Sequence, residues 1–190
     1  PVLEKVQRAL GDRPKQMAFL TGGCVAEVHA FQAAGERWVI KVDREDSGVL
    51  ACEGRMLRYL DQHSPLPVPA PVAFDNSFLL MPYIAGASHW DEQAERHAAE
   101  LLAEMHDQQM PYFGFTEDTV IGGLPQSNPH TDKWVPFFRD QRLLDMAHQA
   151  FDAGRLPLRV FEDIERLAAR LEQFLPEPDC PALLHGDVWS

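Results

Sequence analysis

The sequence predicts an α+β fold of two lobes, with a β-rich N-terminal half followed by a mainly helical half. Short segments of strand-like composition dominate the chain up to Ile84. After residue 90 the apolar residues recur at helical spacing, and Ala85-Gly86-Ala87-Ser88 breaks the pattern between the two halves. We therefore expect one lobe over residues 1–84 and a second over residues 85–190.

The first lobe is expected to hold an antiparallel sheet. Val2 to Leu10 has helical spacing and is followed by Gly11-Asp12-Arg13-Pro14, which would end a short entry helix. Strands are predicted at 17–20, 25–32 and 37–42, and an antiparallel meander is the simplest way to join them. Residues 47–62 then predict a helix, for which Ser47 is the expected N-cap.

A proline-rich stretch and a hairpin complete this lobe. Prolines at every second position from Pro65 to Pro71 remove amide donors and fix φ, which predicts a stiff connector; a polyproline ligand is the alternative. The segments 72–74 and 78–84 flank Asp75-Asn76-Ser77 and predict a hairpin. The lobe would then be a five-stranded antiparallel sheet with one helix packed on it.

The second half predicts helices at 90–106, 134–153 and 158–174. No internal repeat is visible in the sequence.

Composition excludes several classes of partner. The chain has 190 residues, 45% of them hydrophobic, and 17 basic against 29 acidic residues give a net charge of −12. This charge would repel nucleic acids and anionic membranes. There is no membrane-length apolar stretch and no secretory pattern at the N-terminus, so we expect a cytoplasmic protein. The three cysteines are widely spaced, which predicts reduced thiols rather than disulfides or a zinc site.

Two parts of the first lobe are candidates for binding a phosphorylated ligand. Gly22 and Gly23 lie between two predicted strands, where backbone amides could approach phosphate oxygens; an ordinary hairpin turn is the alternative. Lys41 ends a buried strand and needs a partner, for which Glu53 on the following helix is the best candidate. A solvent-facing lysine and an unrelated surface glutamate are the alternative.

The segment Met81-Pro82-Tyr83-Ile84-Ala85 leads from the last strand toward the second lobe, as a hinge that binds adenine would. Pro82 could offer only its carbonyl, so the Ile84 amide is the expected donor to the ring. A strand that simply ends at a proline is the alternative.

Asp187 is the expected catalytic carboxylate, because an apolar run that presents an aspartate through His185-Gly186 is typical of kinase-type folds. The glycine turn, the strand lysine, the helix glutamate and the late aspartate occur along the chain in the same order as the corresponding features of kinase sequences. Asp187 would accept or orient the proton of the attacking hydroxyl. The Arg that pairs with a phosphorylated activation loop in protein kinases is replaced by Gly186, which favours a small-molecule kinase.

The chain resembles the fructosamine kinase (ketosamine 3-kinase) family, which belongs to the aminoglycoside-phosphotransferase-like kinases with a protein-kinase-like fold. The resemblance runs along essentially the whole chain. It rests on four segments: Leu184-His185-Gly186-Asp187-Val188-Trp189-Ser190, Tyr112-Phe113-Gly114-Phe115, Ile121-Gly122-Gly123-Leu124-Pro125-Gln126-Ser127-Asn128-Pro129 and Trp134-Val135-Pro136-Phe137-Phe138-Arg139.

The resemblance implies ATP-dependent phosphorylation of the 3-hydroxyl of a sugar attached to an amine, such as fructoselysine or a ribulosamine, free or on a protein. It also implies Mg²⁺, whose Asn and Asp ligands in the family lie beyond the position of Ser190, so no metal ligand is expected within the chain. On this basis we expect residues 1–190 alone to form a truncated second lobe, to be inactive, and to self-associate through uncovered apolar surface.

Two rival interpretations remain open at this stage. One is another small-molecule kinase of the same superfamily, acting on choline or an aminoglycoside, and the other is a non-catalytic nucleotide-binding module. Cys24, in the glycine turn, is either a redox-sensitive thiol or a buried inert residue. The sequence does not indicate which ketosamine is preferred, or whether Asn128 or Trp134 contacts it.

Overall fold

The computed structural model describes residues 2–20, 26–86 and 91–186. The chain forms two compact units. Unit 1 comprises Pro1–Met105 and Val120–Leu124, and unit 2 comprises His106–Thr119 and Pro125–Ser190. The lobe boundary that the sequence predicts at residues 84 and 85 stays a prediction.

Unit 1 is built on a five-stranded sheet. Its order is β1-β2-β3-β5-β4, and every neighbouring pair is antiparallel. The strands are β1 (Lys15–Leu20), β2 (Glu27–Ala33), β3 (Glu36–Val42), β4 (Ala73–Asp75) and β5 (Phe78–Pro82). The predicted sheet is therefore confirmed, including the meander of its first three strands and the hairpin of its last two.

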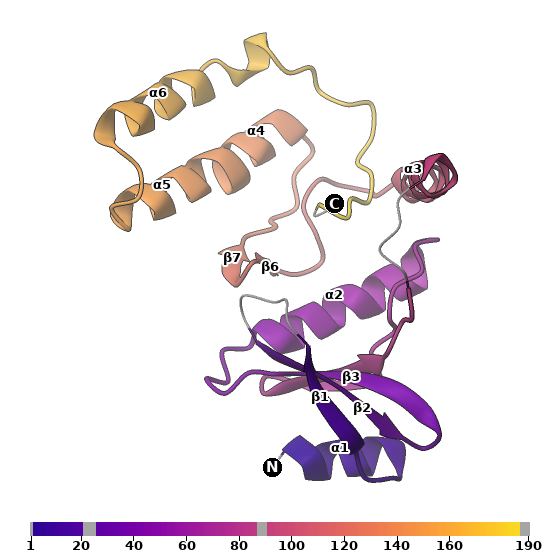
Figure 1. Ribbon diagram of the computed structural model, residues 1–190. Helices are drawn as coiled ribbons and strands as arrows, with labels where there is room; N and C mark the ends of the chain where they lie inside the picture. The colour runs from indigo at the N-terminus through magenta and orange to yellow at the C-terminus, as the bar shows by residue number, and fades with distance from the viewer. Residues whose placement is uncertain (1, 21–25, 87–90, 187–190) are drawn as a thin grey trace. The chain divides into compact units, whose positions relative to one another are not determined.

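Helix α1 (Val2–Leu10) covers one face of this sheet (Figure 1). Its Val6 is fully buried against a core that includes Phe31, Ile40 and Leu80. At the rim, Lys5 Nζ donates to Asp75 Oδ2 at 2.5 Å and to Ser77 Oγ at 3.0 Å, which ties the helix to the β4–β5 turn. The predicted entry helix is thus confirmed, and it is a structural part of the unit.

Helix α2 (Val49–His63) covers the opposite face of the sheet (Figure 1). The prediction that Ser47 is its N-cap is wrong. Gly48 occupies that position with φ of +88°, a left-handed conformation that glycine adopts without strain. The Ser47 hydroxyl instead donates to Asp43, four residues earlier.

Gly54 lets α2 approach the sheet closely. A Cβ at this position would lie 2.4 Å from Cγ of Phe74, which belongs to β4. Glycine inside a helix costs about 1 kcal/mol relative to alanine, so its presence here is explained by this contact.

The connector after α2 contains neither helix nor strand from Ser64 to Pro71, as its prolines predict. Helix α3 (Glu92–His106) follows the last strand of the sheet. Among the described residues, no helix combines the length and apolar character that crossing a bilayer requires.

The second half contains a short hairpin and a set of helices. They are β6 (Thr119–Ile121), β7 (Leu124–Gln126), α4 (Trp134–Phe138), the π-helix η1 (Arg139–Leu144), α5 (Asp145–Asp152), α6 (Leu158–Ala168) and the 3₁₀-helix η2 (Leu171–Gln173). The sequence did not predict the hairpin or the π-helical turn. The predicted helix 158–174 is wrong at its end, because Arg170 leaves the helical region with φ of −125° and ψ of 10°.

Candidate functional site

The ion pair expected in the first lobe is present. Lys41 Nζ on β3 donates to Glu53 Oε1 on α2 at 2.5 Å. The two side chains keep 28% and 30% of their surface exposed, so the pair lies at the edge of the core. Strand and helix therefore meet through opposite charges, and both side chains keep part of their surface exposed to solvent.

Apolar residues share the sheet face of Lys41. Side chains alternate along a strand, and Ile40 and Leu80 face α1, so the residues next to them face α2. The strand register places Ala30, Val39 and Met81 in one row across the sheet and puts Lys41 in the next row. The sequence analysis named Met81 only as part of the hinge. The shared parity with Lys41 on one strand could have found Val39, whereas Ala30 is found only from the register between β2 and β3.

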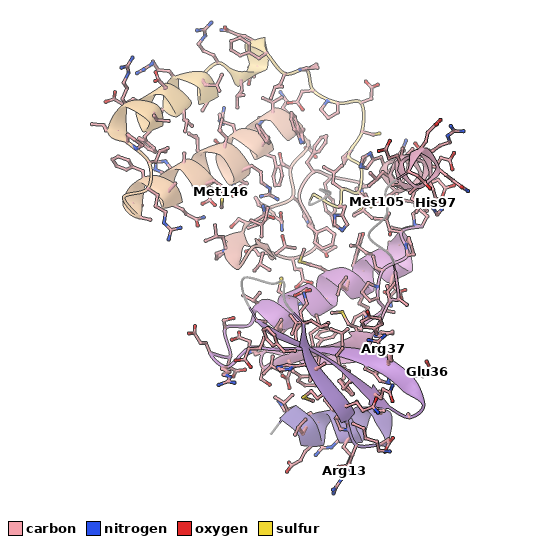
Figure 2. The ribbon with its side chains drawn as sticks, in the orientation of Figure 1. Arg13, Glu36, Arg37, His97, Met105 and Met146 are labelled. Carbon is pink, nitrogen blue, oxygen red and sulfur yellow. The ribbon has the colours of Figure 1, made fainter. Side chains whose placement is uncertain are left out.

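The segment after β5 is held against β3 by Tyr83. The Tyr83 amide donates to the Arg37 carbonyl at 3.0 Å, and the Arg37 guanidinium lies 3.8 Å from the centre of the Tyr83 ring. Arg37 and Glu36 lie together at the β2–β3 turn (Figure 2).

On the edge of β5 that faces away from β3, only some of the backbone groups form hydrogen bonds with described residues. The Leu80 carbonyl accepts from Val72 at 2.9 Å on the side away from β3. By strand alternation the Pro82 carbonyl points to that same side. Its neighbour there would be Pro71, which has no amide hydrogen to give.

A cavity of about 220 Å³ borders this sheet face. It is lined by Gln16, Ala18, Ala30, Phe31, Gln32 and Arg37. The small side chains of Ala18 and Ala30, which are paired across β1 and β2, help to leave this space open.

Residues 113–115 and 128–131 pack together within unit 2, and each stretch includes part of a segment that carries the family resemblance. Phe113 and Thr131 exchange backbone hydrogen bonds at 2.9 and 3.0 Å. Gly114 has φ of +105°, and a Cβ there would lie 2.3 Å from the Pro129 carbonyl oxygen. Only glycine allows this close approach.

Asn128 is the centre of a buried polar network in unit 2. It is 5% exposed, and its Nδ2 lies within hydrogen-bonding distance of the Glu117 carbonyl (3.0 Å), Thr119 Oγ1 (2.9 Å) and the Gln126 carbonyl (3.2 Å). Its Oδ1 accepts from Arg142 at 2.5 Å, and burial lowers the pKa of that guanidinium. The Asn128 side chain is therefore fully engaged by the protein.

A second cavity, of about 550 Å³, lies within unit 2. Its walls come from residues 115–118, residues 127–130 and η1: Phe115, Thr116, Glu117, Asp118, Ser127, Asn128, Pro129, His130 and Gln141. Trp134 does not line it; its amide donates to Glu177 Oε2 at 2.7 Å and its ring stacks on Phe138.

The chain leading to Asp187 is held by strand-like pairing. The Met110 amide donates to the Pro181 carbonyl at 2.9 Å, and the Leu183 amide to the Gln108 carbonyl at 3.2 Å. Leu183 is buried and Leu184 is exposed. Asp187 itself, like Gly22, Gly23 and Cys24, lies outside the described residues.

The described residues offer no cluster of three or more histidine, cysteine or acidic side chains arranged to hold a metal ion.

Comparisons with known proteins agree with this architecture. The fructosamine kinase family model matches residues 2–190. The probable ketoamine kinase YniA of Escherichia coli K12 is 30% identical over an alignment of 184 residues that covers 90% of this chain and 60% of YniA. The chloroplastic protein-ribulosamine 3-kinase of Arabidopsis thaliana is 28% identical over 184 residues, covering 89% of this chain and 54% of that protein.

Solved structures match as well. A candidate fructosamine-3-kinase from Thermobifida fusca superimposes with a TM-score of 0.86 and 27% identity, over 99% of this chain and 67% of that one. The macrolide 2'-phosphotransferase MphH of Brachybacterium faecium shares the fold, with a TM-score of 0.55 and 16% identity over 99% of this chain and 64% of that one. The fold is therefore protein-kinase-like. This chain thus spans less than two thirds of the length of each of these two curated relatives.

Proposed function

Since the chain belongs to the fructosamine kinase family, we propose that it carries the nucleotide-binding lobe and the catalytic carboxylate of an ATP-dependent kinase acting on ketosamines. The phosphorylated group would be the 3-hydroxyl of a fructosamine or ribulosamine, free or attached to protein. The name of the Arabidopsis relative supports this choice. The single observation that carries the proposal is the Lys41–Glu53 ion pair beside the apolar row of Ala30, Val39 and Met81.

Lys41 would hold the α- and β-phosphates of ATP. Its ammonium has three donors, and Glu53 is its one hydrogen-bonded partner among the described residues. The ion pair keeps the long side chain extended, so less rotamer entropy is lost when phosphate binds.

Adenine would lie against Ala30 and Val39 and meet the hinge, Met81 to Ala85. The Pro82 carbonyl points away from β3 and would accept from the exocyclic amine. The same alternation directs the Ile84 amide to this side, where it would donate to the ring. Gly22 and Gly23 would cover the phosphates with backbone amides.

Asp187 would orient the substrate 3-hydroxyl and accept its proton as the oxygen attacks the γ-phosphorus, while the bond from that phosphorus to the β–γ bridging oxygen breaks and ADP leaves. Mg²⁺ would neutralise charge on the phosphates. The described residues contain no group of three or more histidine, cysteine or acidic side chains that could hold it.

Replacing Lys41 by methionine in the full-length protein tests this function. Lys41→Met should reduce kcat/KM for ATP by about 100-fold or more, because loss of a phosphate-stabilising charge removes several kcal/mol from the transition state. The matched control is Lys5→Met, since Lys5 also pairs with a carboxylate in this unit but lies with α1 on the other side of the sheet. It should lower stability and leave ATP kinetics unchanged.

The substrate class is tested in the same assay with fructoselysine, ribuloselysine, choline and an aminoglycoside. Preference for either ketosamine supports the proposal, and preference for choline or the aminoglycoside contradicts it. Unchanged ATP kinetics in Lys41→Met would contradict the assigned nucleotide site.

A further inference from the structure

The link between β3 and α2 is folded around a single carboxylate, that of Asp43. Its side chain accepts from the Glu45 amide at 2.9 Å, the Ser47 amide at 3.0 Å and the Ser47 hydroxyl at 2.5 Å. Its own amide donates to the Ser77 carbonyl at 3.0 Å. Asp43 is 8% exposed, so these bonds form in a site with little access to water.

This link has an unfavourable backbone conformation. Asp46 has φ of +56° and Gly48 has φ of +88°, both in the left-handed region. For Asp46 this costs free energy, of the order of 1 kcal/mol. The three hydrogen bonds to the Asp43 carboxylate compensate for that cost and select this one path between strand and helix.

The two elements joined by the link are those whose side chains form the ion pair. Asp43 follows Lys41 by two residues, and Ser47 precedes α2 by two. The Ser47 hydroxyl also accepts from the Val49 amide at 3.3 Å, in the first turn of α2. Glu53 lies one turn further along the same helix. A change in the link therefore moves Glu53 relative to Lys41.

We propose that Asp43 is a positioning residue for nucleotide binding, which sets the place of α2 and so the geometry of the Lys41–Glu53 pair. This inference rests on the proposed function of Lys41. In this proposal Asp43 acts through α2 and not by direct contact with the nucleotide.

The test is ATP affinity of Asp43→Asn in the full-length protein, measured by calorimetry with a non-hydrolysable ATP analogue and Mg²⁺. Asparagine has the same shape, but it offers one acceptor oxygen to three donors and turns an NH₂ group toward one of them. Kd should rise about tenfold, equivalent to about 1.4 kcal/mol. KM for ATP should rise in parallel, with KM for the ketosamine unchanged. Ser47→Ala, which removes one donor, should show a smaller increase in the same direction.

The matched control is Asp12→Asn. Asp12 also accepts two backbone amides in a loop of unit 1, those of Arg13 at 2.7 Å and Ala34 at 2.9 Å, without joining the two elements that carry the pair. Asp12→Asn should change thermal stability and leave Kd for the ATP analogue unchanged. An equal rise in Kd in both variants would overturn the inference, since it would reflect a general loss of stability.

A double-mutant cycle with Glu53→Gln separates positioning from an independent effect. If Asp43 acts through the pair, adding Asp43→Asn to Glu53→Gln should change Kd by less than about twofold. A full tenfold effect in that background overturns the inference. Absence of ATP-analogue binding in the wild-type protein is a different result, because it contradicts the proposed function itself.

Discussion

Two buried or half-buried polar centres of the molecule differ in how completely the protein uses them. In unit 1, Lys41 donates to Glu53 alone among the described residues, and both side chains stay about 30% exposed. In unit 2, Asn128 is 5% exposed, and both its amide nitrogen and its amide oxygen are bonded to protein groups. Both centres are polar, but of the two only the Lys41 ammonium keeps N–H donors that no described protein group accepts.

The difference indicates two roles. Spare hydrogen-bonding capacity in a partly open site is what a ligand requires, whereas a saturated network fixes the shape of the backbone around it. Asn128 is held by Arg142 from η1, and η1 is a π-helical turn that adds one residue to the helical path. We infer that Lys41 serves binding and Asn128 serves folding. Variants that separate stability from activity can test this assignment of roles.

The largest stability effect is expected for Asn128→Ala. Asn128 is 5% exposed, and removing its amide takes away the hydrogen bonds that it forms with Arg142 Nη2 and with the Glu117 and Gln126 carbonyls. The free energy of unfolding should fall by about 2–4 kcal/mol. Denaturant unfolding of the full-length protein measures this free energy. In the comparison variant Lys41→Met, the free energy of unfolding should fall by no more than about 1 kcal/mol. A larger loss in Lys41→Met than in Asn128→Ala would reverse the roles assigned here.

A smaller effect on stability is expected for Gly54→Ala, which changes the contact between α2 and β4. The new Cβ would lie 2.4 Å from Phe74 Cγ, so the helix or the ring must shift. Overpacking costs about 1–3 kcal/mol and outweighs the gain of about 1 kcal/mol in helix propensity. We expect a modest fall in melting temperature together with a raised KM for ATP, because Glu53 is the preceding residue.

The companion variant Gly54→Ala/Phe74→Leu makes room for the new methyl group. It should recover much of the ATP affinity lost in the single variant. If Gly54→Ala is as stable and as active as the wild type, α2 is not positioned by this contact.

The sequence predicted the parts of the fold that local pattern controls. The apolar, strand-like run that ends at Lys41 and the helical spacing around Glu53 were sufficient to place strand, helix and ion pair. The prediction for Ser47 failed because the Asp43 carboxylate binds its hydroxyl, an interaction that local propensity does not reveal. The roles of Gly22, Gly23 and Asp187 stay predictions.

Other features depend on contacts between distant residues. The row formed by Ala30, Val39 and Met81 requires the register of three strands. The start of α4 is capped by Glu177, whose carboxylate accepts from the amides of Trp134 and Val135 more than forty residues earlier. The hairpin β6–β7 was missed because its strands have three residues each, too few to show a period.

The smallest effect we predict is a difference in acid sensitivity between the two units. In unit 1, burial opposes ionisation of Asp75, but hydrogen bonds from Lys5 and Ser77 outweigh it and lower the pKa. Hydrogen bonds from Ser47 and Glu45 lower the pKa of Asp43. A carboxyl group with a lowered folded-state pKa stabilises the protein above its unfolded pKa of about 3.9, and this stability is lost as the pH falls through the folded value.

Hydrogen exchange measured between about pH 5 and pH 3 can follow this loss segment by segment, after correction for the intrinsic rate. Protection of α1 and of the β4–β5 turn should fall more steeply than that of α5 and α6. In Asp75→Asn, protection of α1 should be lower at pH 5 and change less on acidification. Asp140→Asn is the matched control, since the pKa of Asp140 is lowered by Arg139 in unit 2, and it should leave the acid response of α1 unchanged. Equal acid responses of α1 in the wild type and in Asp75→Asn would show that the Lys5–Asp75 contact does not set it.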